Sequence, residues 1–172
     1  NPLASLEIPN VYTDAFQVNG TLYANLTPVK NLVITSRLGY RFNNTYTYRY
    51  EKPNWNNTAV GSTKPYLATT QLGSKYYQLE NFVNYNLKLG KNDFAVMAGT
   101  SYIKSVANYM SSSTDELQSM ADNYHYLNYS TSTANDVIGG NTTEKVQIAY
   151  YGRLTWNYGD RYNLQFNFRA DS

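Results

Sequence analysis

The residues of this chain that could do chemistry are few and scattered. His125 is the only histidine, in "NYHYLNY", and the chain has no cysteine. A zinc site or a catalytic site built on His125 would need a second histidine, a cysteine or suitably spaced carboxylates, and the sequence supplies none of these beside it. We therefore interpret His125 as a loop histidine among tyrosines, and we expect no metal site and no cofactor.

Three acidic residues lie close together and could suggest the paired carboxylates of a glycosidase: Asp115, Glu116 and Asp122. Ser113 and Glu116 also have the spacing of a capping box, which predicts a short helix from Ser113 with these acids on its surface. The stretches "GSTKP" and "LGSK" lack the glycine spacing of a phosphate-binding loop. We expect that the protein is not an enzyme.

Two sets of side chains could contact a solute. The first set is aromatic and lies in polar segments: Trp55, Tyr66, Tyr109, Tyr124, Tyr126 and Tyr129. These rings could stack on sugars or contact a partner protein, and the alternative is ordinary loop packing. The second set is basic: Arg37, Arg41, Arg153 and Arg169. These arginines could guide a polar solute, and the alternative is pairing across strands with Glu80 or Asp171.

Alternation of apolar and polar residues predicts the elements that carry these side chains. Near the end of the chain, Leu154 and Trp156 precede the turn "YGDR" and Leu164 and Phe166 follow it, each separated from the next by a polar residue. Tight turns are also predicted at "TPVKN" and "LGKND". The same period of two predicts four strands at residues 16–27, 32–43, 77–89 and 94–103, a fifth from near Val146, a sixth after "YGDR", and long polar loops at 44–73 and 105–142.

The apolar series of these predicted strands contains no charged residue. Such a face fits either the core of a soluble sandwich or the lipid-facing side of a transmembrane barrel. Three features favour the barrel. The alternation lasts for about the 9–11 residues that a tilted strand needs to cross a bilayer. The short turns and the long loops lie at opposite ends, and aromatic residues gather near both strand ends: Trp156, Tyr158 and Tyr162 at one, Tyr40 and Phe42 at the other.

We therefore expect an all-β fold, an antiparallel up-and-down segment of about six strands from a transmembrane β-barrel. Bacterial barrels begin at about eight strands, so residues 1–172 should be part of a single larger barrel domain, with the signal, plug and remaining strands outside this sequence. The formal net charge of +2 gives no reason to expect nucleic acid as a partner.

Several stretches of the sequence resemble one family of membrane proteins. "YYGRLTWNYGDRYNLQFNFRADS" resembles a hallmark stretch of the SusC/RagA family of TonB-dependent transporters. "NPLASLE", "ANLTPVKNLVITSRLGY" and "QLENFVNYNLKLGKNDFAVMAGTS" are similar to a segment and two hairpins of that family. The turn "YGDR" and the preceding "TWNY" depart from its usual pattern.

The resemblance implies a bacterial outer-membrane protein with a barrel of about 22 strands and an N-terminal plug. It implies energy input from the TonB system, a SusD-like surface lipoprotein as partner, and import of oligosaccharides or peptides. Two other functions stay open at this point: a secreted all-β sandwich that binds a ligand without transporting it, and a passive porin.

Overall fold

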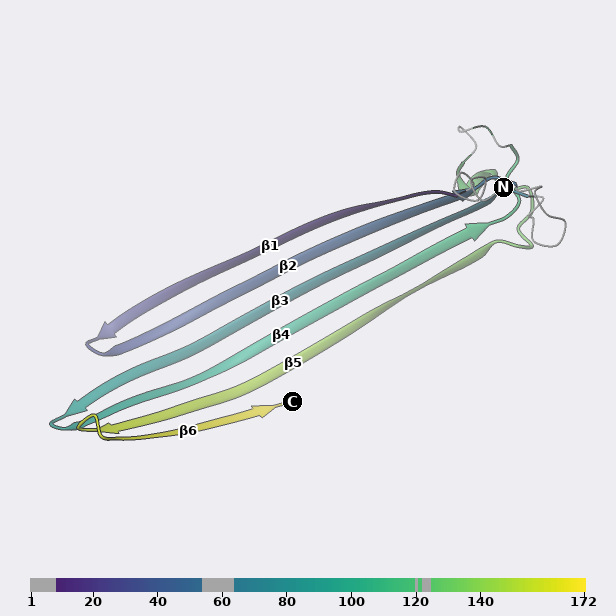
Figure 1. Cartoon of the computed structure of the whole chain (residues 1–172). Helices are drawn as coiled ribbons and strands as arrows, with labels where there is room; N and C mark the ends of the chain where they lie inside the picture. The colour runs from purple at the N-terminus through teal and green to yellow at the C-terminus, as the bar shows by residue number, and fades with distance from the viewer. Residues whose placement is uncertain (1–8, 54–63, 120, 122–124) are drawn as a thin grey trace. The chain divides into compact units, whose positions relative to one another are not determined.

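The computed structural model describes residues 9–53, 64–119, 121 and 125–172. Six β-strands form one sheet in the order β1-β2-β3-β4-β5-β6, so that each strand lies beside its neighbours in the sequence (Figure 1). The strands are β1 (Pro9–Val29), β2 (Leu32–Glu51), β3 (Tyr66–Leu89), β4 (Asn92–Thr114), β5 (Val137–Tyr158) and β6 (Tyr162–Asp171). The expected all-β, antiparallel up-and-down arrangement of six strands is confirmed.

The strands are longer than the alternation predicts, since β1 to β5 each have between 20 and 24 residues. The connections that were expected at 44–73 and 105–142 shrink to residues 52–65 and 115–136. Tyr66 therefore opens β3 and Tyr109 lies within β4, so placing these two residues in loops was wrong. The strands extend further because these segments are rich in threonine and tyrosine, which suit strands. Their residues continue to pair between strands beyond the last apolar residue of each predicted strand.

The tight turns are confirmed at all three expected places. Asn31 after β1 has φ 68°, Gly90 after β3 has φ 62°, and Gly159 and Asp160 after β5 have φ 54° and 57°. Glycine adopts this left-handed conformation without steric cost, and asparagine and aspartate tolerate it better than other residues. Turns with positive φ match the right-handed twist of the strands that they join.

The register of the last hairpin confirms which residues share a side of the sheet. Leu154 lies opposite Phe166 and Trp156 opposite Leu164, whereas Arg153 lies opposite Asn167. Successive side chains in a strand point to opposite faces, so the apolar series and the polar series each occupy one side of this hairpin. The apolar series is open to solvent, with Leu164 64% and Phe166 67% exposed.

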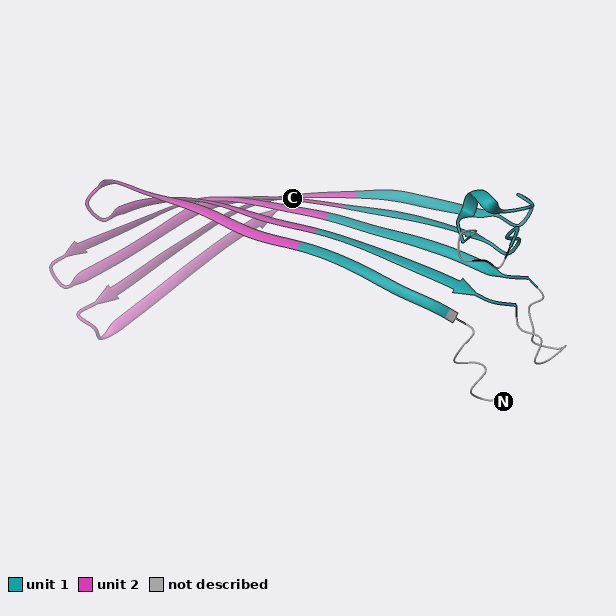
Figure 2. Cartoon of the chain, turned by 90° about the horizontal axis from the view of Figure 1, so that it is seen from above, with its two compact units in different colours: residues 1–17, 43–74, 107–143 teal, residues 18–42, 75–106, 144–172 magenta. Residues whose placement is uncertain are grey.

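The chain divides into two compact units, which Figure 2 colours separately. Unit 1 comprises residues 1–17, 43–74 and 107–143, and unit 2 comprises residues 18–42, 75–106 and 144–172. Among the residues that the structure describes, the buried apolar cluster lies in unit 1, where Leu127 packs against Tyr50, Leu67 and Leu117. Unit 2 contains the three tight turns and, apart from Phe16, the apolar series of the predicted strands. The described part of the chain contains no helix long and apolar enough to cross a membrane.

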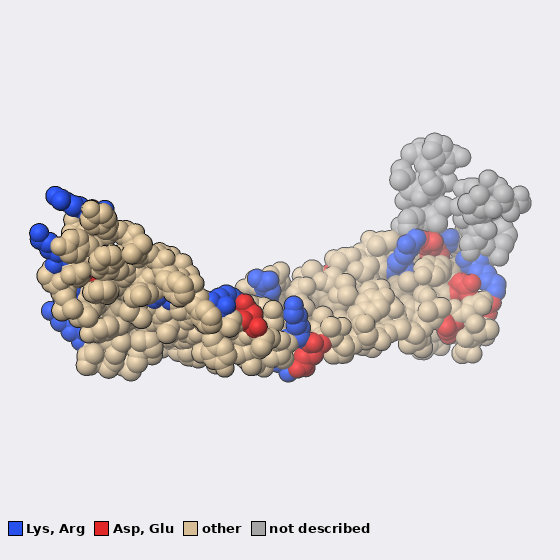
Figure 3. All heavy atoms as spheres, turned by 90° about the horizontal axis from the view of Figure 1, so that it is seen from below, with Lys and Arg blue, Asp and Glu red and all other residues tan. Residues whose placement is uncertain are grey.

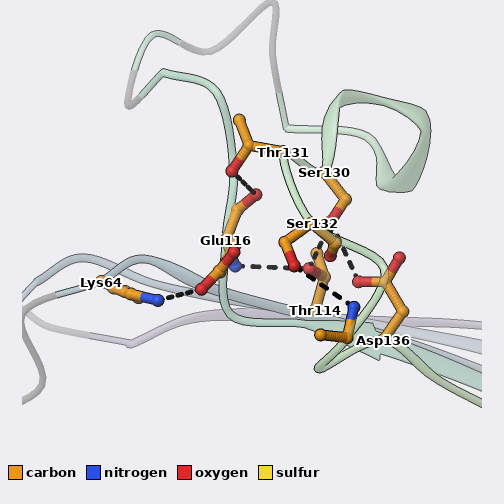
Figure 4. Close-up of polar contacts among 8 residues, drawn as sticks. Lys64, Thr114, Glu116, Ser130, Thr131, Ser132 and Asp136 are labelled. Atoms are coloured by element: carbon orange, nitrogen blue, oxygen red, sulfur yellow. Dashed lines mark hydrogen bonds and ion pairs between the residues drawn. The ribbon is translucent and has the colours of Figure 1, made fainter.

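The segment after β4 is extended, so the short helix expected from Ser113 is wrong. Ser113 belongs to β4, and Leu117 forms an antiparallel bridge with Ser130. The backbone N–H of Gln118 donates to the Tyr129 carbonyl at 2.9 Å, and that of Thr131 donates to the Glu116 carbonyl at 2.7 Å. The hydroxyl of Thr131 also donates to the Glu116 carbonyl (Figure 4). These cross-loop bonds take the backbone groups that a helix would use. The helical turn described in this loop is η2 (Leu127–Tyr129), a 3-10 turn.

Candidate functional site

A basic hollow lies on the polar side of unit 2 and has a volume of about 410 Å³. Arg37, Arg153 and Arg169 line it from β2, β5 and β6, together with Glu80 and Tyr151. Sequence reasoning singled out these three arginines separately, and the sheet brings them to one place. Figure 3 shows charged side chains in small groups, separated by uncharged surface, on the face that it presents.

Two of the arginines have carboxylate partners. Arg37 Nη1 lies 3.5 Å from Glu80 Oε2 on the neighbouring strand, and the Arg37 guanidinium lies 5.8 Å from the centre of the Phe82 ring. Arg169 Nη2 lies 2.8 Å from Asp171 Oδ1 within β6. Pairing with Glu80 and Asp171, the alternative weighed from the sequence, is therefore present for these two arginines, across strands for Arg37 and along one strand for Arg169.

The other two arginines bond to asparagines. Arg153 Nε donates to Asn167 Oδ1 at 3.2 Å, and Arg41 Nε donates to Asn19 Oδ1 at 3.1 Å. Within the described residues neither guanidinium pairs with a carboxylate. Arginine has five N–H donors, so a single hydrogen bond from Nε leaves the donors of both Nη atoms. These can bind a carboxylate or a phosphate through two parallel hydrogen bonds. A role for these four arginines in guiding a solute stays a prediction.

Gly99 in β4 lies against Phe82 and Tyr151, two residues that line the basic hollow. A Cβ atom there would lie 2.7 Å from Phe82 Cβ and 2.8 Å from Tyr151 Cε2. Both distances are shorter than a carbon–carbon contact, so the absence of a side chain lets Phe82 and Tyr151 approach each other over β4. Sequence reasoning did not identify this position, because a glycine within a strand gives no indication of what lies beside it.

The aromatic residues expected in loops separate into different places. Tyr126 lies in the described loop with 63% of its surface exposed, and Tyr129 ends η2. Tyr66 and Tyr109 lie in strands, and Trp55 and Tyr124 lie outside the described residues. Tyr126 lines a second hollow, of about 370 Å³, in unit 1, with Tyr12, Tyr46 and Tyr48 from β1 and β2. The tyrosines of "TYTYRY" show the same alternation as the predicted strands, which is the signal that could have found them.

His125 packs in unit 1 as expected of a loop histidine among tyrosines. Its ring stacks on Tyr50, with 3.7 Å between ring centres and 26° between ring planes. Tyr50 is only 2% exposed, so the contact fixes the loop to the buried cluster. In the part of the chain that the structure describes, no group of three or more His, Cys, Asp or Glu side chains could hold a metal ion.

An ion pair and a set of hydroxyl bonds fix the loop between β4 and β5. The Glu116 carboxylate accepts a hydrogen bond from the Lys64 ammonium, which holds the pKa of Glu116 below its usual value and raises the pKa of Lys64 (Figure 4). Ser130 Oγ donates to Asp136 Oδ1 at 3.0 Å. Glu116 and Asp136 therefore hold the loop together, whereas paired glycosidase carboxylates would face a substrate cleft. Asp122, one of the three acids considered for such a pair, lies outside the described residues.

Solved structures share the fold of this chain. The structure of the RagAB peptide transporter superposes with a TM-score of 0.88 at 18% sequence identity, covering 98% of this chain and 18% of the other. The structure of the RagAB peptide importer in its open-open state superposes with a TM-score of 0.86 at 19% sequence identity, covering 97% of this chain and 18% of the other. The chain thus spans about a fifth of the length of the solved chains that it matches.

Sequence comparisons add nothing to this likeness. No protein-family profile matches the sequence, and no curated protein matches it. At identities below a fifth, the agreement with the RagAB structures establishes the fold, which is that of a part of a peptide transporter's chain.

Proposed function

We propose that this chain is part of the barrel of a SusC-like, TonB-dependent outer-membrane transporter that imports oligosaccharides or peptides together with a SusD-like surface lipoprotein. The observation that carries the proposal is the uncovered apolar side of unit 2. On β1, Leu22 is 74% exposed. On β6, Leu164 is 64% exposed and Phe166 is 67% exposed. In a soluble sandwich a second sheet would cover these side chains, and in a membrane barrel lipid covers them.

The length of the charge-free series supports a bilayer as the covering medium. On β4 the series runs from Phe94 to Tyr102, and the next residue of that series, Lys104, pairs with Glu144 on β5 at 2.7 Å. A tilted strand crosses the hydrocarbon layer in about 9–11 residues, so an ion pair just beyond Tyr102 fits the edge of that layer. We place the hydrocarbon-facing band between this pair and the tight turns.

Aromatic side chains lie at both ends of this band. Tyr40 and Tyr77 approach each other at 5.4 Å between ring centres on β2 and β3. At the end with the tight turns, the centre of the Tyr158 ring lies 6.2 Å from that of Trp156 and 6.5 Å from that of Tyr162. Rings with one polar atom suit the boundary between lipid and water, so the two groups fit the two girdles of a membrane barrel.

The edges of the sheet support the proposal that residues 1–172 belong to a larger barrel domain. In the described structure, β1 and β6 each pair with one neighbouring strand. Backbone groups on their outer edges would be unpaired in lipid, which costs several kcal/mol for each group. Further strands, up to a barrel of about 22, would pair both edges.

Two independent lines point to the same class of transporter. The sequence stretches that resemble the SusC/RagA family come from the hairpins, and the shared fold with the RagAB peptide transporter covers nearly the whole chain. In this proposal Arg37, Arg41, Arg153 and Arg169 face the aqueous interior and guide a polar solute. The aromatic residues Trp55, Tyr66, Tyr109, Tyr124 and Tyr126 contact the solute or the lipoprotein on the cell surface.

The location of the full-length protein tests the proposal. We expect the tagged protein in the outer-membrane fraction, with a surface lipoprotein co-purifying in a fixed ratio. We also expect a solute, oligosaccharide or peptide, whose uptake is lost both without the protein and when a protonophore removes the energy supply. Recovery from the culture medium as a soluble protein would instead support the secreted sandwich. Uptake that survives the protonophore would support a passive porin.

A further inference from the structure

The hollow in unit 1 is named here the tyrosine groove. It is lined by four tyrosines and four other residues: Tyr12, Tyr46, Tyr48, Tyr126, Leu67, Thr69, His125 and Leu127. Its volume of about 370 Å³ is in the range of small-ligand sites, which begin at about 300 Å³. Tyr12, Tyr46 and Tyr48 come from paired strands and Tyr126 comes from the loop after β4. The groove therefore joins a rigid wall to an exposed loop residue.

The rings of the tyrosine groove are held in place before any ligand binds. The rings of Tyr12 and Tyr48 stack with 4.9 Å between their centres and 22° between their planes. The rings of Tyr12 and Tyr46 have 6.2 Å between their centres and 54° between their planes. Leu67, which also lines the groove, is 1% exposed, and the stacking of His125 on Tyr50 anchors the residue before Tyr126. A site whose side chains are already fixed loses little side-chain entropy on binding.

The tyrosine groove combines aromatic walls with a few polar groups. No Asp, Glu, Lys or Arg lines it, so a ligand with a formal charge would be desolvated there without a carboxylate, ammonium or guanidinium to pair with. Its walls are mainly tyrosine rings and two leucines, and its polar groups are the phenols, the imidazole of His125 and Thr69 Oγ1, which lies 2.9 Å from Ser112 Oγ. A matching ligand has an apolar face to pack on the rings and a rim of neutral groups that donate and accept hydrogen bonds.

We propose that the tyrosine groove binds a saccharide. A sugar ring has a face of C–H groups and an edge of hydroxyls, which correspond to the ring faces and the hydroxyls of the groove. A proline-rich peptide also packs on tyrosines, but it extends about 3.1 Å per residue, so a recognised stretch would run well beyond a hollow of this size. The sugar can come from a free oligosaccharide or from the headgroup of a membrane glycolipid.

Binding to the full-length protein tests this assignment. The protein is purified in a detergent without a sugar headgroup, and calorimetry measures the binding of neutral hexaoses of glucose, mannose, galactose and N-acetylglucosamine. A second arm uses nanodiscs with and without rough lipopolysaccharide, and a third uses decaproline. Binding of at least one hexaose, or of the glycolipid, is expected, and the arm in which it occurs identifies the source.

The variants Tyr12→Ala and Tyr126→Ala remove partly exposed rings and leave the buried cluster unchanged. Each should weaken saccharide binding about 3- to 10-fold, as expected for loss of one aromatic contact. The control is Tyr23→Ala, which removes a ring 71% exposed elsewhere on β1 and should leave the affinity unchanged. The proposal is overturned if no saccharide binds, if all three variants bind alike, or if decaproline alone binds. The assay needs no transport, so its failure is distinct from failure of the proposed function.

Discussion

The four arginines show what a residue type can and cannot reveal. Their place in the polar series follows from alternation, and the register confirms it for Arg153, which lies opposite Asn167. Glu80 and Asp171 are partners that the sequence suggests, but the sequence does not say which arginine pairs with which. Arg37 pairs with Glu80, 43 positions away on the neighbouring strand, and Arg169 pairs with Asp171, two positions along its own strand. The first pair depends on which strands are neighbours, and the sequence pattern of a single strand does not contain that information.

We expect a side chain at position 99 to disturb the packing beside the basic hollow. Gly99→Ala would place a Cβ within 2.8 Å of the Phe82 and Tyr151 side chains, so one of them has to move. Overpacking of this kind costs about 1–3 kcal/mol. We expect the full-length protein to unfold at lower denaturant concentration in this variant. Gly20→Ala is the control, since nothing lies within 4 Å of a Cβ at position 20. Equal unfolding midpoints for the two variants would contradict the account of Gly99.

The Lys64–Glu116 pair predicts how the loop between β4 and β5 responds to pH. The pKa of Glu116 is lowered by Lys64, so the stabilisation is present above the ordinary value of 4.5 and is lost as pH falls through the lowered value. The pKa of Lys64 is raised by Glu116, so the stabilisation is present below the ordinary value of 10.5 and is lost as pH rises through the raised value. The effect is small because the Lys64 side chain is half exposed, so that solvent screens the pair although Glu116 is only 18% exposed.

Hydrogen exchange of the amides of residues 115–119 and 125–136 measures this response. At pH 7 these amides should be better protected in the native protein than in Glu116→Gln, and the difference should vanish once pH falls below the lowered pKa of Glu116. Glu51→Gln, which removes the partner of Arg49, serves as the control. A difference between native protein and Glu116→Gln that persists unchanged at low pH would show that the ion pair is not its cause.

At the scale of elements, the strands and the tight turns follow from local sequence, and the strand ends do not. Alternation and turn residues predicted six strands and three hairpins correctly. The strands continue past residues 43 and 103 because neighbouring strands pair there. Tyrosines still alternate with polar residues at 45–50, whereas residues 104–114 show no such alternation. The helix predicted at Ser113 is wrong for the same kind of reason. Leu117 bridges to Ser130 and the N–H of Thr131 donates to the Glu116 carbonyl, and these contacts across the loop outweigh the capping box.

The loop between β4 and β5 and the tight turns should lie on opposite sides of the membrane. Long loops face outside the cell and short turns face the periplasm in bacterial barrels. Single cysteines replacing Thr133 and Lys91 in the full-length protein test this with an impermeant maleimide. On whole cells we expect labelling at position 133 only, and labelling at both positions once the outer membrane is permeabilised. Labelling at position 91 alone on whole cells would show the opposite orientation, with the tight turns outside the cell.

At the scale of the molecule, an apolar face and two open edges make the isolated chain unsuited to water. Exposed side chains such as Leu22 and Phe166 favour association, and unpaired edge strands favour pairing between chains. We expect residues 1–172, expressed alone in detergent-free buffer, to aggregate or oligomerise in size-exclusion chromatography with light scattering. A monodisperse monomer that melts cooperatively would contradict the membrane assignment and favour a soluble domain.

The central claim is that lipid covers the apolar side of unit 2, and the last hairpin offers the most direct measurement. Leu164 lies opposite Trp156 in the apolar series, and Asn163 lies opposite Asn157 in the polar series. A fluorophore on a single cysteine at either position, in the full-length protein in bilayers, is exposed to a lipid-attached quencher and to a water-soluble one. We expect quenching from the lipid at 164 and not at 163. If both positions escape the lipid quencher while 164 is also shielded from water, protein covers this face and the transporter assignment is wrong.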